Sequence, residues 1–191
     1  QSVKETFRPD VTGYKVDVWA RRLEVPWSIV FLPDGRALIS ERPGRIRLAD
    51  KDGTIAEAPW MTIPVRARGE GGLMGLALHP QFRDQPFVYA MMTVEDGGKA
   101  MNRVVRIRLG GGPVGGGASG GQPQIDKVII DNIPAGTYHN GGRIAFGPDG
   151  MLYVTTGETF QAELAQDLKS LGGKILRVTP DGAVPRDNPF P

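Results

Sequence analysis

A chain of 191 residues is long enough for one domain with a sizeable core, and its 40% hydrophobic residues argue against global disorder. The 23 basic and 21 acidic side chains nearly balance, and no basic stripe is interleaved with aromatics, which argues against nucleic acid as a partner. The absence of cysteine excludes disulfides and thiolate metal sites, and the longest apolar runs are far too short to span a membrane.

The first predicted unit is a β-hairpin followed by further strands. Residues 27–41 read WSIVFLPDGRALISE, an apolar strand, a Pro-Asp-Gly turn and a second strand. Pro-Asp-Gly suits a tight connection between antiparallel strands. Residues 44–50 alternate basic and apolar side chains, so this third strand packs one face and exposes arginine on the other. A fourth strand is expected at residues 58–64.

The second unit repeats this plan with a longer turn and an insertion. Its hairpin covers residues 75–93, where the turn is stretched to HPQFRDQP. Residues 102–109 alternate like the third strand of the first unit, and a fourth strand is expected at residues 125–133. Between them, residues 110–124 (GGGPVGGGASGGQPQ) are too poor in apolar side chains to pack, which indicates a flexible surface insertion. They lack the Gly-Lys-Ser/Thr ending of a phosphate-binding loop.

The third unit has a hairpin at residues 142–158, again with a Pro-Asp-Gly turn. Residues 161–171 (QAELAQDLKSL) are rich in good helix formers and predict a short helix that caps one end of the unit. A third strand follows within residues 173–182.

Three copies of one hairpin plan indicate an all-β fold built by radial repetition. Pro33 and Pro80 lie 47 residues apart, which matches the usual repeat of a four-stranded β-propeller blade, about 40–50 residues. Pro80 and Pro148 lie 68 apart, and the Gly-rich insertion explains the excess. We therefore expect residues 1–191 to form the N-terminal part of a single propeller domain, with about three blades. A β-sandwich stays the alternative.

Two histidines are candidates for chemistry. His79 precedes a proline turn at the end of an apolar strand, where local hydrogen bonds would satisfy it. His139 lies between a loop and the first strand of the third unit, and Gly141 and Gly142 after it let backbone or a flat ligand approach closely. A purely structural role for His139 stays open at this point.

Glu70 stands in a Gly-rich turn that leads into the first strand of the second unit, the same relative position as His139 in the third. In a propeller, loops entering the innermost strands cluster at one end of the central channel, so both side chains could face one site. The alternative for Glu70 is a solvated turn residue. Glu158 ends the second strand of its unit, as an edge carboxylate or a supporting group. No metal site is expected in this part of the chain, because two distant histidines do not make a zinc site.

Four collinear motifs resemble the soluble glucose/sorbosone dehydrogenase family, and most closely its bacterial aldose sugar dehydrogenase branch. They are VPWSIVFLPDGRALISERPGRI, GEGGLMGLALHPQF, YHNGGRIAFGPDGMLYVTTGE and LGGKILRVTPDGAVPRDNPF, at residues 25–46, 69–82, 138–158 and 171–190. The resemblance implies a six-bladed propeller of four-stranded antiparallel blades that binds pyrroloquinoline quinone (PQQ), usually with calcium.

The resemblance also implies residue roles. His139 would be the general base that takes the proton from the sugar's C1 hydroxyl, while the C1 hydride passes to the quinone and a lactone forms. Glu70 would contact the cofactor or the substrate, and we expect it to bind the cofactor. Glucose-specific members carry Asp at the position of Tyr138 and Gln at that of Thr159, where both contact sugar. These two residues are therefore expected to bind substrate, with a broader preference for aldoses than for glucose alone.

Further expectations concern the rest of the protein. The family's calcium ligands and its cationic contacts to the quinone lie C-terminal to these residues, so the chain alone is expected neither to close nor to oxidise sugar. An external electron acceptor and a periplasmic or secreted location follow from the family. No signal peptide is visible, because the sequence starts at Gln1 with the polar stretch QSVKETFRPD. This start fits a processed secreted protein or a trimmed chain. A non-catalytic extracellular binding propeller and a metal-dependent propeller lactonase are the alternatives.

Overall fold

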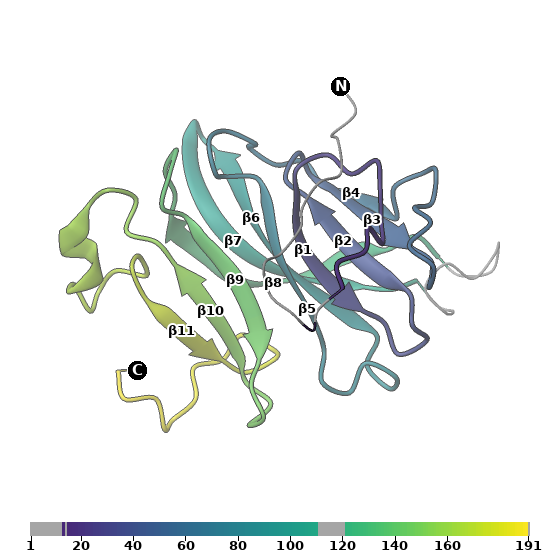
Figure 1. Cartoon of the computed structure of the whole chain (residues 1–191). Coiled ribbons are helices and arrows are strands. Elements are labelled where there is room, and N and C mark those ends of the chain that lie inside the picture. Colours follow the sequence, from purple (N-terminus) through teal and green to yellow (C-terminus); the bar gives the residue numbers. More distant parts are fainter. Residues whose placement is uncertain (1–12, 14, 111–120, 191) are drawn as a thin grey trace.

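The structure, a computed structural model, describes residues 13, 15–110 and 121–190. Within these ranges the regular secondary structure is almost entirely β-strand, and three antiparallel sheets follow one another along the chain (Figure 1). The predicted all-β class is confirmed. Most of the predicted Gly-rich insertion, residues 111–120, lies outside the described residues.

The first sheet keeps the order of the sequence. It runs from β1 (Pro26–Phe31) through β2 (Ala37–Glu41) and β3 (Arg45–Ala49) to β4 (Met61–Thr62). Gly35 in the predicted turn has a φ of +88°, a conformation that glycine adopts at little cost. The expected fourth strand is confirmed, although only its two residues pair with β3.

The second sheet has the same topology and longer strands. Its order is β5 (Leu73–Leu78), β6 (Phe87–Asp96), β7 (Lys99–Arg108) and β8 (Gln124–Pro134). β6 and β7 pair without interruption from end to end. The fourth strand expected after the Gly-rich insertion is confirmed as β8.

The third sheet contains three strands within the described residues. β9 (Gly141–Phe146) pairs with β10 (Leu152–Thr156), which pairs with β11 (Ile175–Val178). The three hairpins β1–β2, β5–β6 and β9–β10 therefore confirm the repeat that the sequence predicts.

The second sheet is buried on both faces, and β6 shows this residue by residue. Val88, Ala90 and Met92 belong to the apolar core shared with the first sheet. Tyr89 and Met91 belong to the core shared with the third sheet. Because successive side chains of a strand point to opposite faces, this apolar run serves two cores at once.

The first strands of the three sheets lie side by side, with β5 between β1 and β9 (Figure 1). Their approach is close enough to require glycine. A Cβ at Gly75 would lie 2.3 Å from the carbonyl oxygen of Gly142, and a Cβ at Gly142 would lie 3.0 Å from the ring of Trp27. The guanidinium of Arg143 reaches across to the same ring, 4.4 Å from its centroid. This is the arrangement of inner strands around a propeller axis.

The helix predicted at residues 161–171 is wrong in type and extent. Only a 3-10 turn forms, η1 (Ala162–Ala165), and none of its residues is buried. The side chains of Asp167 and Ser170 accept hydrogen bonds from backbone N–H groups two residues further on, which compete with helical bonding. Without an apolar face to bury, helix propensity alone does not hold so short a segment. Among the described residues, no helix is long and apolar enough to cross a membrane.

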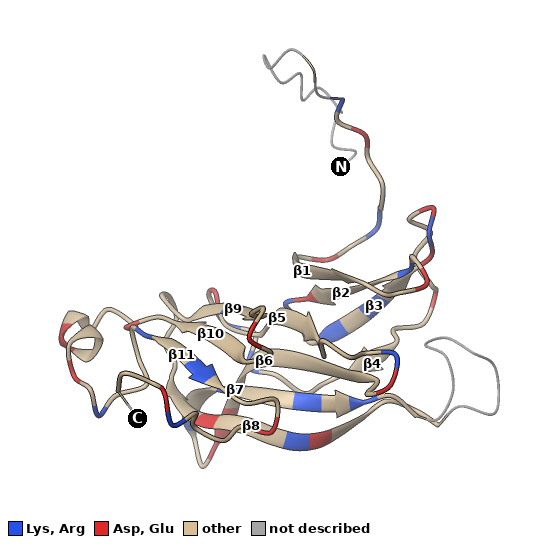
Figure 2. Cartoon of the chain, turned by 90° about the horizontal axis from the view of Figure 1, so that it is seen from below, with Lys and Arg blue, Asp and Glu red and all other residues tan. Residues whose placement is uncertain are grey.

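Charged side chains lie mainly on the outer strands. Figure 2 shows basic and acidic bands along β7 and β8, whereas the inner strand β5 carries none. Arg103 pairs with Asp131 at 2.7 Å and Arg106 with Asp126 at 2.6 Å, both across the β7–β8 ladder. The predicted alternation of basic and apolar residues in the third strand is confirmed here.

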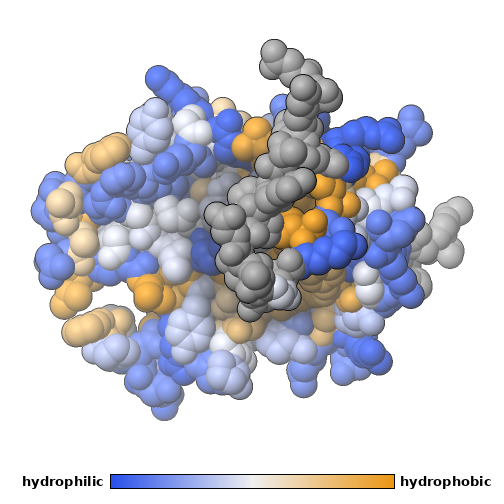
Figure 3. All heavy atoms as spheres, in the orientation of Figure 1, coloured by the Kyte–Doolittle hydropathy of each residue, from blue (hydrophilic) through white to orange (hydrophobic). Residues whose placement is uncertain are grey.

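The first and third sheets expose apolar side chains on faces that the second sheet does not cover. Val30 and Leu32 pack into the first core, so the alternating Ile29 and Phe31 point to the opposite face, where both are exposed. Ile175 on β11 is exposed as well. Figure 3 shows apolar residues gathered over the region of the first sheet. Such surface is usual where another part of a protein packs.

Candidate functional site

His139 lies in the loop that leads from β8 into β9, with 45% of its side chain exposed. Its φ of +55° is in the left-handed region, which non-glycine residues seldom adopt. The buried Asn140 holds this loop: its Oδ1 accepts hydrogen bonds from the Gly136 backbone and the Asn102 side chain, and its Nδ2 donates to the Gly136 carbonyl. A buried amide with several partners fixes the backbone from which His139 projects.

Glu158 contacts the imidazole ring of His139. It follows β10, and its Oε1 lies 2.5 Å from His139 Nδ1. This hydrogen bond lowers the pKa of the Glu158 carboxyl below its ordinary value, so the carboxylate is ionised near neutral pH. An ionised carboxylate only accepts hydrogen bonds, so Nδ1 carries a proton, and in the neutral imidazole the free lone pair is on Nε2. Within the described ranges, no hydrogen bond to Nε2 is found.

Glu70 binds the backbone of His139 rather than its ring. Glu70 Oε2 accepts a hydrogen bond from the His139 N–H at 2.7 Å, and the Glu70 N–H donates to the Thr137 carbonyl at 2.8 Å. Gly69 permits this approach, because a Cβ there would lie 2.0 Å from the Thr137 oxygen. The structure thus brings together the two loops that the sequence placed at equivalent positions.

The other two predicted residues are close to His139: Tyr138 precedes it in the chain, and Thr159 bonds its backbone. The Thr159 N–H donates to the His139 carbonyl at 3.2 Å, and the Thr159 hydroxyl accepts from Gln161. Tyr138 is exposed, and its ring centroid lies 6.1 Å from that of Phe160. Sequence reasoning missed Phe160, whose ring centroid is only 4.0 Å from that of His139.

Arg42 adds a cation from the first sheet and was also missed. It follows β2, and its Nη1 donates to the Gly69 carbonyl. Its own carbonyl accepts from the Leu73 N–H at 2.9 Å, which ties the two sheets together. A Cβ at Gly72 would lie 2.3 Å from that carbonyl oxygen. Loops from all three sheets therefore meet at one end of the inner strands.

The arrangement is chemically suited to proton abstraction. An imidazole with a carboxylate on Nδ1 can accept a proton at Nε2, and the carboxylate stabilises the imidazolium that forms. In the part of the chain described, no group of three or more His, Cys, Asp or Glu has the spacing of a metal site. Two hollows of about 580 and 410 Å³ lie along Trp19, and neither is lined by His139 or Glu70. The His139 side chain itself is 45% exposed to solvent.

Comparisons with known proteins match nearly the whole chain. The family model described as Glucose / Sorbosone dehydrogenase matches residues 23–191. The aldose sugar dehydrogenase YliI of Escherichia coli is 35% identical over 186 residues, which are 92% of this chain and 46% of that protein. The Hedgehog-interacting protein of Mus musculus is 26% identical over 196 residues, 87% of this chain and 27% of that protein.

Solved structures agree with this match. The PQQ-bound aldose sugar dehydrogenase of Streptomyces coelicolor is 42% identical with a TM-score of 0.81, over 92% of this chain and 51% of that one. An oxidoreductase of Thermus thermophilus, described as a glucose dehydrogenase, is 53% identical with a TM-score of 0.78, over 90% of this chain and 48% of that one. The chain spans about half the length of the Escherichia coli relative and of both solved structures. Its three sheets are blades of a partial β-propeller, and the chain belongs to the glucose/sorbosone dehydrogenase family, whose N-terminal part it covers.

Proposed function

We propose that the complete protein to which these blades belong is a PQQ-dependent dehydrogenase that oxidises aldose sugars at C1 to the lactone and passes the electrons to an external acceptor. The observation that carries the proposal is the contact between Glu158 and His139 Nδ1, which leaves Nε2 without a hydrogen bond among the described residues, on a side chain that is 45% exposed. Family membership and the PQQ-bound relative support it.

Residues close to His139 fit a flat, anionic cofactor. PQQ carries three carboxylates and a pyrrole N–H, so it needs cations and at least one acceptor. Arg42 supplies a guanidinium beside the Gly69–Glu70 turn, and Glu70 Oε1 has no hydrogen-bond partner among the described residues. We assign Glu70 and Arg42 to holding the cofactor, with further cations from the remaining blades.

The protein's own residues would handle the proton. Bound PQQ supplies the acceptor for the hydride that leaves C1. His139 Nε2 takes the proton of the C1 hydroxyl, and Glu158 stabilises the resulting imidazolium through Nδ1. Tyr138 and Thr159, both close to His139, would contact the sugar and give a broad preference for aldoses.

The remaining parts of the proposal lie beyond these blades. Calcium would be bound by residues of the C-terminal blades. Those blades would also cover the exposed apolar faces around Phe31 and Ile175, so the chain alone would neither close nor oxidise sugar. We also propose a periplasmic or secreted location, which the resemblance to the family implies.

Titration of the complete apo-protein with PQQ and calcium tests the function. Dye-linked oxidation of aldoses should appear with PQQ and stay absent with divalent metal alone, and the 191-residue chain should show none. Hydrolysis of lactones with metal alone would support the lactonase instead. A non-catalytic binding propeller is the second candidate, favoured by the similarity to the Hedgehog-interacting protein, and it predicts no turnover under either condition.

A further inference from the structure

Phe160 covers one face of the His139 imidazole. The two ring centroids are 4.0 Å apart and the planes are inclined by 33°. Phe160 is nevertheless 67% exposed, so its ring adds little to an apolar core. Leu168, in the same segment, is 68% exposed and belongs to neither of the two main cores. Phe160 and Leu168 are therefore equally exposed, but only Phe160 of the two contacts the imidazole.

The backbone around Phe160 takes an unfavourable conformation to make this contact. Thr159 and Phe160 have φ values of +54° and +62°, and two consecutive left-handed non-glycine residues are costly. Two hydrogen bonds hold them: the Thr159 N–H donates to the His139 carbonyl, and the Phe160 N–H donates to Glu158 Oε1 at 3.3 Å. Strained backbone held in this way is typical of functional sites.

Gly157 makes the same loop possible from the other side. A Cβ at this position would lie 1.8 Å from the His139 carbonyl oxygen, so only glycine allows the chain after β10 to pass so close. The loop therefore meets His139 at three points: its carbonyl, its Nδ1 and one face of its ring.

We propose that Phe160 is a positioning residue, which acts with Glu158 to hold the His139 imidazole in one orientation and one tautomer. Glu158 fixes Nδ1 as the protonated nitrogen, but a single hydrogen bond leaves the ring free to tilt and rotate about it. A flat side chain against the ring face removes that freedom. This inference rests on the proposed role of His139 as general base, because only then does the direction of Nε2 matter for turnover.

The test compares Phe160→Ala with Leu168→Ala in the complete PQQ-loaded protein. Phe160→Ala should lower kcat about 10-fold with KM changed less than about twofold, since small misplacements of a reacting group are expensive. Leu168→Ala should leave both unchanged, and Phe160→Tyr should restore kcat. Should Phe160→Ala fold poorly, Phe160→Leu keeps the apolar volume without a flat face and should still lower kcat.

Nitrogen-15 NMR of the histidine rings in the apo-protein shows which nitrogen of His139 is protonated, and it does so independently of turnover. The His139 signals, assigned by their loss in His139→Gln, should show one Nδ1-protonated tautomer in the wild type and averaged tautomers in Phe160→Ala, where the unsupported ring can rotate away from Glu158. An unchanged kcat and an unchanged tautomer would overturn the inference, and so would a rise in KM alone, which would make Phe160 a sugar platform. Normal turnover of His139→Ala would instead defeat the proposed function, and the NMR result would then decide the positioning role by itself.

Discussion

Glu158 and His139 meet because of the register of one hairpin. β10 pairs with β9 so that Thr156 lies opposite Gly141. Extending this pairing by two residues places Glu158 opposite His139, and the turned-back loop brings the carboxylate onto Nδ1. Since the hydrogen bond lowers the Glu158 pKa, the bond between the ionised carboxylate and Nδ1–H is fully present above the ordinary carboxyl pKa and is lost as the pH falls through the lowered value.

Removing the Glu158 carboxylate should slow turnover of the complete protein. Glu158→Ala is expected to lower kcat about 10–100-fold, the range known for losing a group that orients a metal-bound histidine. Glu158→Gln should fall between, because its amide oxygen still accepts from Nδ1–H without the charge. Glu163→Gln changes an exposed carboxylate on η1 and serves as the matched control. Steady-state kinetics near neutral pH measure all three, and equal kcat values would refute the role.

For single residues, the sequence predicts which side chains lie close together better than it predicts which atoms are in contact. Equivalent positions in successive repeats correctly place Glu70 beside His139. The actual contact, a carboxylate on the backbone N–H, depends on the left-handed φ of His139 and could not be read from residue types. The contact of Phe160 was missed for the same reason, because nothing in residues 155–160 (TTGETF) predicts two consecutive residues with left-handed φ values.

The strands and turns follow from local patterns, and the helix does not. Each hairpin combines an apolar strand with a turn, and these two signals agree with the tertiary structure. The segment after β10 has helix formers but no buried face, so side-chain hydrogen bonds to the backbone prevail beyond η1 (Ala162–Ala165). Propensity without burial is a weak guide to a short helix.

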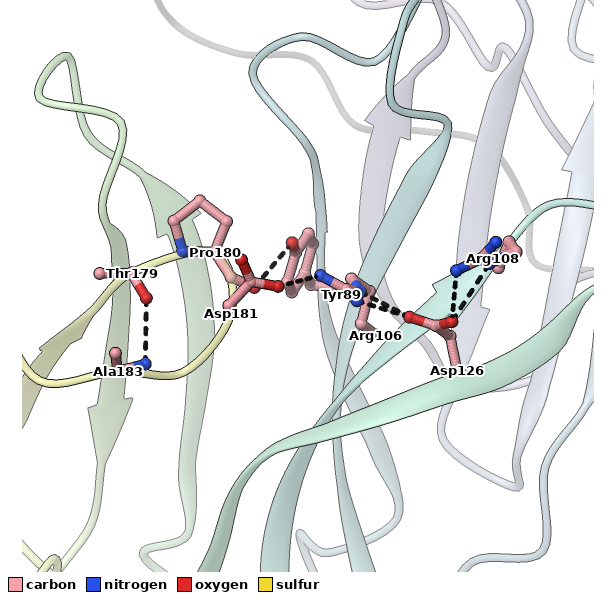
Figure 4. Close-up of polar contacts among 8 residues, drawn as sticks. All are labelled: Tyr89, Arg106, Arg108, Asp126, Thr179, Pro180, Asp181 and Ala183. Atoms are coloured by element: carbon pink, nitrogen blue, oxygen red, sulfur yellow. Dashed lines mark hydrogen bonds and ion pairs between the residues drawn. The ribbon is translucent and has the colours of Figure 1, made fainter.

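Arg106 links the second and third sheets, a contact that no local sequence pattern predicts. From β7 it bonds Asp126 on β8 at 2.8 Å and Asp181, in the turn after β11, at 2.7 Å (Figure 4). The Tyr89 hydroxyl donates to the Pro180 carbonyl of the same turn at 3.0 Å. The side chain of Arg106 is only 12% exposed, whereas that of Arg108, which also bonds Asp126, is 61% exposed.

Arg106→Met should therefore destabilise the complete protein far more than Arg108→Met. Hydrogen bonds to charged groups are worth about 1.5–3 kcal/mol when little exposed, and we expect a loss in that range for Arg106→Met. For Arg108→Met the loss should stay below about 1 kcal/mol, because exposed ion pairs contribute little. Reversible denaturant unfolding measures both, and equal losses would show that the link to Asp181 adds nothing.

The whole molecule is a partial propeller whose repeat is legible in the sequence. Three hairpins and the spacing between them predict three successive sheets. The doubly buried second sheet explains why β6 is apolar on both faces. What the repeat cannot reveal is the number of blades needed to close the ring, because each blade packs only on its neighbours and carries no count of the total.

The assignment of His139 as general base is tested most directly by single-turnover reduction of the PQQ-loaded complete protein. After mixing with an aldose, stopped-flow absorbance should show reduction at least about 10²-fold slower in His139→Ala and His139→Asn than in the wild type. PQQ affinity should change little, because the backbone N–H that binds Glu70 remains, and Asn tolerates the left-handed φ. Reduction at the wild-type rate in either variant would contradict the role of His139.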